Sequence, residues 1–136
     1  MYLFFKILWY NVLKVDMKEV KCKLIRIKVP ATTTNLGPGF DCLGVALDIY
    51  NIIEVEEKTE GLEIYVPGEQ KSGIPLDKSN LVYTAMKKVF DKVGYSVKGL
   101  KINLKSNIPL TRGLGSSAAC IIGGLTASNE LVGRIL

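Results

Sequence analysis

The spacing of apolar residues along this 136-residue chain changes between two periods, and this change restricts the fold more than any other feature. In several segments apolar and polar residues alternate, which is typical of strands. These segments are residues 20–29, 49–57, 62–66 and 97–104. Residues 79–93 and 116–132 instead have the spacing and composition of helices. The resulting order of strand, loop, strands, helix, strand, loop and helix predicts an α+β or α/β sandwich with helices on one face of a sheet.

The first predicted helix has one apolar face and recognisable ends. The residues of its apolar face are Leu81, Val82, Ala85, Met86, Val89, Phe90 and Val93. Ser79 or Asn80 is suited to cap its N-terminus, and Gly94 is suited to end it. The second helix is rich in small residues, and we expect it to end at Gly133.

The composition excludes several kinds of chemistry. Apolar residues make up 48% and charged residues 23%, so the chain can bury a core as one small domain or as part of a larger one. Because the sequence holds no histidine, it can form neither a Ser-His-Asp or Cys-His pair nor a histidine-bound metal site. The formal charge of +5 suits an anionic ligand such as a phosphate, and a solvated basic surface explains it equally well.

Other partners and compartments have less support. Basic residues form no dense run and are not interleaved with aromatics, so we expect no nucleic-acid partner. The cysteines, Cys22, Cys42 and Cys120, are odd in number and widely spaced, which favours buried thiols in a reducing cytoplasm over disulfides or a zinc site. Residues 1–15 are apolar but are interrupted by Lys6, Asn11 and Lys14, whereas a membrane span needs about 20 consecutive apolar residues. We therefore expect no membrane partner.

The two ends of the chain suggest how it is organised. Met17 begins an alternating segment typical of a first strand, so we hypothesise that it is the true start. Residues 1–16 are then an N-terminal extension that lacks the features of a secretory signal, and residues 17–136 are the folded domain. A native mass that includes residues 1–16 would refute this hypothesis. Because the chain stops just after a helical pattern, we interpret the domain as incomplete.

The strongest chemical signal is a glycine-rich loop followed by a helix, residues 109–119 (PLTRGLGSSAA). Gly113 and Gly115 allow unusual backbone angles and let a ligand approach the main chain. The free amides and the dipole of the following helix start form an anion site, and Arg112 adds a positive charge beside it. On these grounds alone, a plain loop with a serine cap before a core helix stays an equal alternative. The segment is neither a Walker A motif nor GxGxxG.

This loop closely resembles the phosphate-binding motif of the GHMP small-molecule kinases. The resemblance implies an ATP-dependent phosphotransferase and an N-terminal domain with a ribosomal-protein-like α+β fold. It assigns nucleotide binding to the following residues: Pro109, Leu110, Thr111, Arg112, Gly113, Leu114, Gly115, Ser116, Ser117, Ala118 and Ala119. Within this motif Ser117 corresponds to the serine that coordinates Mg²⁺ in the family. A weaker match places Asn80, in KSNLVY, beside the adenine base, and a helix cap explains the same residue.

A second motif, residues 29–44 (VPATTTNLGPGFDCLG), combines glycines and a proline with several polar side chains. Taken alone, it is a turn-rich loop with one amide, Asn35, and one carboxylate, Asp41, which would often be a cap or a solvated group. If the loop lines a pocket, Asp41 can bind an ammonium group and Asn35 a hydroxyl or carboxylate. The motif resembles that of the homoserine kinase branch of the GHMP family. By that resemblance Asn35 and Asp41 bind L-homoserine, and Asp41 faces its amino group.

The resemblance also sets expectations for the reaction. It implies attack of the homoserine hydroxyl on the γ-phosphorus of ATP, with Mg²⁺ bridging the phosphates, to form O-phosphohomoserine for threonine biosynthesis. No side chain of the sequence stands out as a general base, so no catalytic residue is assigned. Family members are longer, and a homodimer is a state that the family allows. We expect the 136-residue chain alone to have negligible turnover and weak ATP affinity.

Two alternatives remain from the sequence. One is a different GHMP kinase, such as a mevalonate kinase, against which the long match of the second motif argues. The other is a non-catalytic α+β module that uses residues 109–119 to bind an anion, a nucleotide or a partner. Stabilisation of the chain by ATP would favour the kinase interpretation over the module.

Overall fold

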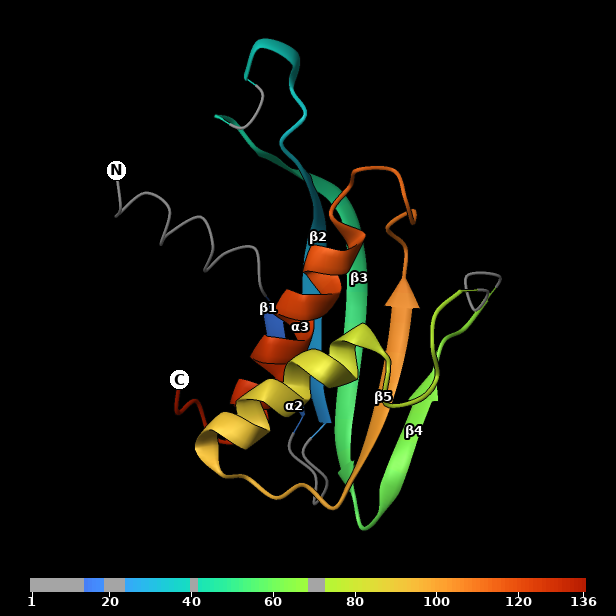
Figure 1. Ribbon diagram of the computed structural model, residues 1–136, viewed down its shortest axis with the longest axis vertical. Helices are drawn as coiled ribbons and strands as arrows, with labels where there is room; N and C mark the ends of the chain where they lie inside the picture. The colour runs from blue at the N-terminus through green and yellow to red at the C-terminus, as the bar shows by residue number, and fades with distance from the viewer. Residues whose placement is uncertain (1–13, 19–23, 40–41, 69–72) are drawn as a thin grey trace.

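The computed structural model describes residues 14–18, 24–39, 42–68 and 73–136. The elements in these ranges are, in chain order, β1 (Lys14–Lys18), β2 (Leu24–Thr33), the 3-10 helix η1 (Gly37–Gly39), β3 (Val45–Lys58), β4 (Gly61–Tyr65), α2 (Leu81–Val93), β5 (Gly99–Ser106) and α3 (Ser116–Leu131). The described strands form one sheet in the order β1-β2-β3-β5-β4, in which only β4 and β5 are parallel. Figure 1 shows α2 and α3 packed against one face of this sheet. The predicted α+β fold, a mixed sheet with helices on one face, is confirmed.

The core lies between the helices and the covered face of the sheet. Alternate residues of the central strands point into it and are almost fully buried, among them Ile25, Ile27, Ile53, Val55, Leu100 and Ile102. The apolar face of α2 covers them, with Val82, Ala85, Met86, Val89 and Phe90 buried. Leu81 was predicted to belong to this face, but it is 39% exposed because it begins the helix at the edge of the core.

Glycines allow α3 to lie close to its neighbours. A Cβ atom on Gly124 would stand 2.6 Å from the carbonyl oxygen of Val82 on α2. On Gly123 it would stand 2.2 Å from the Cδ1 of Ile53 on β3. The small residues of the second predicted helix therefore serve close packing against both layers.

The ends of α2 agree with the sequence prediction. Asn80 is the N-cap, and its side chain accepts a hydrogen bond from the backbone amide of Val82. Gly94 ends the helix with φ of 68°, which a glycine adopts without strain. None of the helices in the described ranges is both long enough and apolar enough to cross a membrane.

The strands differ from the prediction at their ends. The alternation suggested a strand over residues 20–29 that stops before Pro30, but β2 continues to Thr33 because a register shift after Pro30 keeps it paired with β3. For the same reason β3 begins at Val45, four residues before the predicted start. At its other end, β3 is connected to β4 by two residues, Thr59 and Glu60. Residues 14–18 form β1, so the proposed boundary between residues 16 and 17 falls inside a strand. Whether Met17 is the true start stays a prediction.

Candidate functional site

Residues 107–115, which we call the glycine loop, connect β5 to α3 and rest on the end of β2. The backbone amide of Thr32 donates a hydrogen bond to the carbonyl oxygen of Leu114 (3.1 Å). Gly115 lies directly against the same threonine, since a Cβ atom there would be 2.7 Å from its Oγ1. Gly113 and Gly115 have φ angles of 66° and 70°, and Thr111 adopts 57°. The predicted conformational role of both glycines is therefore confirmed.

The N-terminus of α3 has free amides. The first hydrogen bond within the helix runs from the amide of Ala119 to the carbonyl oxygen of Gly115 (2.9 Å), so the three preceding amides have no acceptor in the helix. Gly115 is the N-cap and no side chain caps the helix, so the alternative of a serine cap is wrong. The hydroxyl group of Ser117 is on an exposed residue, whereas Ser116 is buried. Free amides, a helix dipole and an exposed hydroxyl suit an anionic group.

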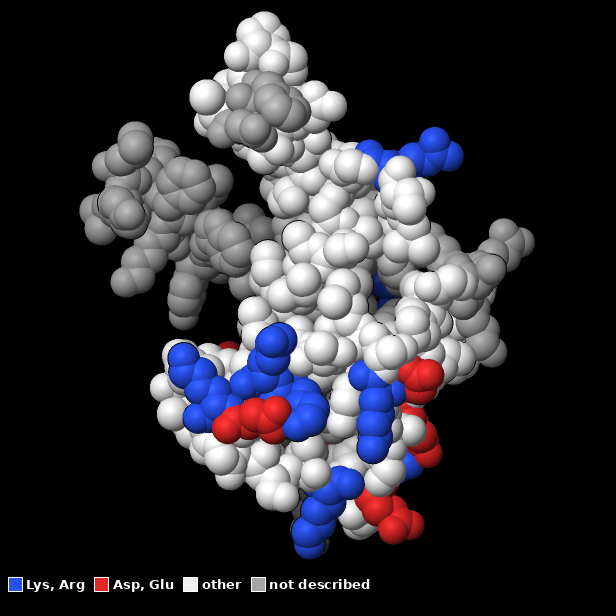
Figure 2. Space-filling model, viewed as in Figure 1, with Lys and Arg blue, Asp and Glu red and all other residues white. Residues whose placement is uncertain are grey.

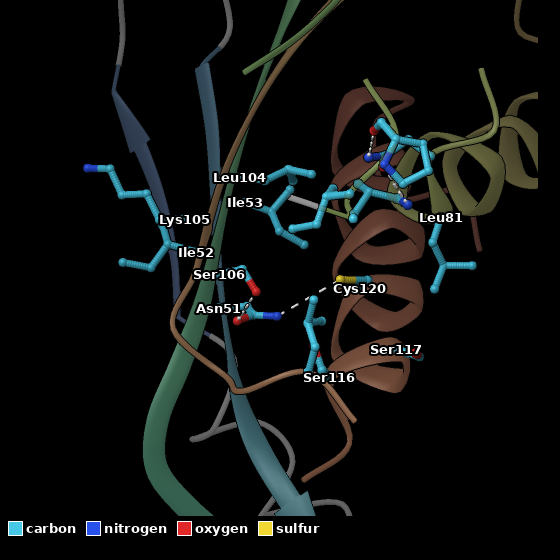
Figure 3. A pocket seen from close by; sticks show the side chains of 16 residues that line it. Asn51, Ile52, Ile53, Leu81, Leu104, Lys105, Ser106, Ser116, Ser117 and Cys120 are labelled. Carbon is cyan, nitrogen blue, oxygen red and sulfur yellow. Dashed lines mark hydrogen bonds between the residues drawn. The ribbon is translucent and has the colours of Figure 1, made fainter. Parts of the chain in front are cut away.

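A cavity of about 170 Å³ lies beside this helix start (Figure 3). One wall comes from β3 and β5, and the other from the starts of α2 and α3 together with the segment before α2. Its lining is largely apolar, with Ile53, Ile74 and Leu104 among the residues. An apolar cleft that opens next to free backbone amides can accommodate a ligand with a flat apolar part and an anionic part.

Asn80 borders this cavity, but its side chain is held by protein atoms. It is 2% exposed, its Nδ2 donates to the carbonyl oxygen of Pro75 (2.7 Å), and its Oδ1 accepts from the amide of Val82 (3.0 Å). The interpretation of Asn80 as a helix cap is therefore confirmed. Its position at the cavity wall is compatible with a base nearby, and contact with adenine stays a prediction.

Asn51 is a site residue that the sequence interpretation did not single out. It lies on β3, is 2% exposed, and its carboxamide reaches three other segments, two of which, at Ser106 and Cys120, are seen in Figure 3. Its Oδ1 accepts hydrogen bonds from the Oγ of Ser106 (3.2 Å) and the amide of Ile108 (3.1 Å). Its Nδ2 donates to the Sγ of Cys120 on α3 (3.9 Å). The one available signal was an asparagine inside an otherwise β-rich apolar segment, where a buried amide needs partners.

The second motif lies at the same end of the sheet as the glycine loop. β2 and β5 both run towards this end, where Figure 1 shows the connection between β2 and β3 extending away from the helices. Asn35 is exposed on this connection, and its backbone amide donates to the Oγ1 of Thr33 (3.3 Å). Asp41 lies outside the described residues. The structure therefore brings the glycine loop into contact with Thr32, near the start of the second motif. Asn35 is exposed on the connection that follows, beyond this contact.

The charged residues do not concentrate at the glycine loop. On the face shown in Figure 2, most Lys and Arg side chains gather over α2 and the end of the molecule below it, interspersed with Asp and Glu. Two of these residues, Lys87 and Asp91, form an exposed ion pair. The solvated-surface interpretation therefore fits most of the positive charge on this face. Arg112 is exposed within the glycine loop, as a ligand-binding cation would be.

Two of the three cysteines, Cys42 and Cys120, lie in the described part of the chain. Cys42 is exposed, so the expectation of buried thiols is wrong there, and Cys22 lies outside the described residues. Burial raises the pKa of the half-buried Cys120 thiol, while the hydrogen bond from Asn51 acts in the opposite direction. No group of three His, Cys, Asp or Glu side chains suited to a metal ion occurs in the described part of the chain.

Known proteins similar to this chain are GHMP kinases. Residues 80–136, which include α2, β5, the glycine loop and α3, match the family model described as GHMP kinases N terminal domain. Over these residues the chain is similar to the N-terminal domain of the GHMP kinases. It is 61% identical over 113 residues to a homoserine kinase from Petrotoga mobilis, and this match covers 83% of the chain and 37% of the relative. A homoserine kinase from Caldicellulosiruptor saccharolyticus is 61% identical over 110 residues, with 81% and 35% covered.

Solved GHMP kinase structures agree with the fold. The crystal structure of homoserine kinase from Cytophaga hutchinsonii superposes with a TM-score of 0.73 at 29% identity, covering 90% of this chain and 39% of that one. The mevalonate kinase of Methanococcus jannaschii has a TM-score of 0.62 at 22% identity, which shows the shared fold alone. The chain thus spans little more than a third of the length of the homoserine kinases it resembles.

Proposed function

We propose that this chain is the nucleotide- and substrate-binding part of a homoserine kinase, which transfers a phosphoryl group from ATP to the hydroxyl of L-homoserine. The product would be O-phospho-L-homoserine, an intermediate of threonine biosynthesis. One observation carries the proposal: an uncapped start of α3 follows a loop whose glycines adopt left-handed angles, beside a largely apolar cavity. The 61% identity to homoserine kinases supports this substrate over that of other GHMP kinases.

The glycine loop and the first turn of α3 would bind the phosphates. The amides of Ser116, Ser117 and Ala118 lack helical acceptors, so they can donate to phosphate oxygens without breaking existing bonds. Because these donors are fixed by the helix and by the contact with Thr32, they need little reorganisation as charge develops. ATP, when bound, supplies the transferred group, and its adenosine part would occupy the apolar cavity.

The residues present fit a magnesium ion only in part. Mg²⁺ in kinases is usually held by one or two protein oxygens together with substrate phosphates. The exposed hydroxyl of Ser117 can supply one such ligand at the start of α3. Further protein ligands are not grouped in the described part of the chain. We therefore propose Ser117 as a single ligand to a nucleotide-bound Mg²⁺.

The second motif would hold homoserine at the same end of the sheet. Asn35 is exposed there with its side chain available, and we propose that it binds the substrate together with Asp41. A carboxylate that neutralises the ammonium group of the substrate is not free to act as a base, so no general base is assigned. Positioning and stabilisation of charge are sufficient contributions for phosphoryl transfer.

Nucleotide binding is tested first on the chain itself. We expect ATP to raise its melting temperature more than adenosine does. In the presence of Mg²⁺, Ser117→Ala should weaken ATP binding by about 3- to 10-fold because the proposed protein ligand to the nucleotide-bound ion is lost. Ser96→Ala is the matched control, because Ser96 is also exposed but follows the end of α2, outside the glycine loop and α3. Equal stabilisation by ATP and adenosine would contradict phosphate binding.

The substrate is tested in a chimera. The matching part of the Petrotoga mobilis enzyme is replaced by the 113 aligned residues of this chain. We expect phosphorylation of homoserine by ATP, with little activity on mevalonate, and loss of homoserine phosphorylation in Asp41→Ala. A folded chimera that prefers mevalonate, or that ignores homoserine, would refute the proposed substrate.

A further inference from the structure

Asn51 connects three segments that meet at the glycine loop. It lies at the end of the pairing between β3 and β5, directly opposite Ser106. Ile108, whose amide it holds, is fully buried at the start of the glycine loop. Cys120, its third partner, is on the second turn of α3. These contacts span 55 to 69 positions along the sequence, so one carboxamide connects the sheet, the loop and the helix.

The far end of the glycine loop is fixed separately. There the amide of Thr32 donates to the carbonyl oxygen of Leu114, and Gly115 packs against the same residue. Between these two attachments, residues 109–113 are exposed, and no hydrogen bond connects them to the sheet within the described part of the chain. The course of this exposed segment is therefore set by its two attachments, and Asn51 provides the first.

Burial makes the asparagine hard to replace. A buried amide that loses its partners is costly, and the same holds for the Ile108 amide if the Asn51 oxygen is removed. Leucine has a similar size but can neither accept nor donate a hydrogen bond. An aspartate keeps the oxygen that accepts from Ser106 and Ile108. The position thus allows the accepted hydrogen bonds to be tested separately from side-chain volume.

We propose that Asn51 is a positioning residue that sets the conformation of the glycine loop for binding phosphate. Its side chain borders the cavity, but it is 2% exposed and its carboxamide bonds to protein atoms. This inference rests on the proposed function for its ligand, a nucleoside triphosphate. In this proposal the start of the glycine loop is attached through a side chain of β3, whereas its far end is attached through the backbone of β2.

Hydrogen exchange of the full chain tests the attachment without any ligand. In Asn51→Leu we expect the Ile108 amide to exchange about 10-fold faster or more, because its acceptor is gone. The amide of Ile102, inside β5, should be unchanged, which separates a local effect from general unfolding. In Asn51→Asp the Ile108 amide should exchange at close to the rate of the unsubstituted chain. Unchanged exchange of Ile108 in Asn51→Leu would overturn the proposal.

Calorimetry then tests the consequence for phosphate binding. Asn51→Leu should bind ATP about 5- to 10-fold more weakly, with a clearly smaller loss for adenosine, since the glycine loop faces the phosphates and Asn51 only borders the cavity proposed for adenosine. The control, Asn103→Leu, removes a half-buried asparagine of β5 that bonds to Glu54 instead, and should leave both affinities unchanged. Equal weakening of ATP and adenosine would overturn the positioning role. If the unsubstituted chain does not prefer ATP over adenosine, the proposed function fails, and the exchange of Ile108 still decides whether Asn51 fixes the loop.

Discussion

Replacement of Gly115 by alanine is the most demanding test of how the glycine loop is built. Gly115 has a φ of 70°, and a non-glycine residue in this region costs about 1 to 2 kcal/mol. Its added Cβ would also stand 2.7 Å from the Oγ1 of Thr32, closer than such contacts allow, and 3.1 Å from the carbonyl oxygen of Thr32, which is a tight contact. Overpacking of this kind costs about 1 to 3 kcal/mol more. We therefore expect Gly115→Ala to lose about 2 to 5 kcal/mol of unfolding free energy.

Gly113→Ala provides the matched comparison. Gly113 has nearly the same φ, 66°, but open space where its Cβ would be. It should therefore lose about 1 to 2 kcal/mol, the backbone cost alone. Urea denaturation of both variants measures the difference, which isolates the contact with Thr32.

A double variant identifies the contact further. Thr32→Ala removes the Oγ1 but keeps the carbonyl oxygen, so Thr32→Ala/Gly115→Ala should recover part of the loss, with a coupling energy of about 1 kcal/mol. Equal stability of Gly115→Ala and Gly113→Ala would refute the reasoning that the loop rests on β2. The same holds if the losses of unfolding free energy in Thr32→Ala and Gly115→Ala simply add in the double variant.

Two further predictions concern packing and pH. Gly124→Ala should lower the melting temperature more than Gly123→Ala. The Cβ atom added at position 124 would meet the rigid carbonyl group of Val82, whereas the Cβ atom added at position 123 would meet the movable end of the Ile53 side chain. The reverse order of melting temperatures in calorimetry would contradict this reasoning. Hydrogen bonds from Ser79 lower the pKa of Asp77, so their contribution is present above the ordinary carboxyl pKa and is lost as pH falls through the lowered pKa. The stability difference between the unsubstituted chain and Asp77→Ala should therefore shrink in acid, and a difference that grows in acid would count against it.

Local signals in the sequence were sufficient for α2 and for the glycine loop. The apolar face of α2 and its caps depend on residues within one or two turns, so Asn80 and Gly94 could be assigned without a structure. Gly113 and Gly115 likewise indicated a loop of unusual backbone angles before a helix, which the structure confirms. What the sequence did not predict at this site is that the N-cap is a glycine and not a serine, which leaves the first amides of α3 free.

Long-range pairing accounts for the rest. The start of β3 at Val45 and the end of β2 at Thr33 follow from the pairing of the two strands across a register shift, which no local pattern specifies. Gly99 allows β5 to pass close to the backbone of Glu60, where a Cβ atom would stand 2.4 Å from its carbonyl carbon, and this contact also depends on the fold. The role of Asn51 was missed for the same reason, since its partners are distant in sequence.

The central claim is that the start of α3 binds the phosphates of a nucleotide. Titration of the ¹⁵N-labelled chain with ATP measures this directly, because each backbone amide is observed separately. The account predicts the largest shifts at the amides of Gly115, Ser116, Ser117 and Ala118, with smaller ones from adenosine at the same positions. Shifts confined to the basic surface of α2, or identical responses to ATP and adenosine at these four amides, would contradict it.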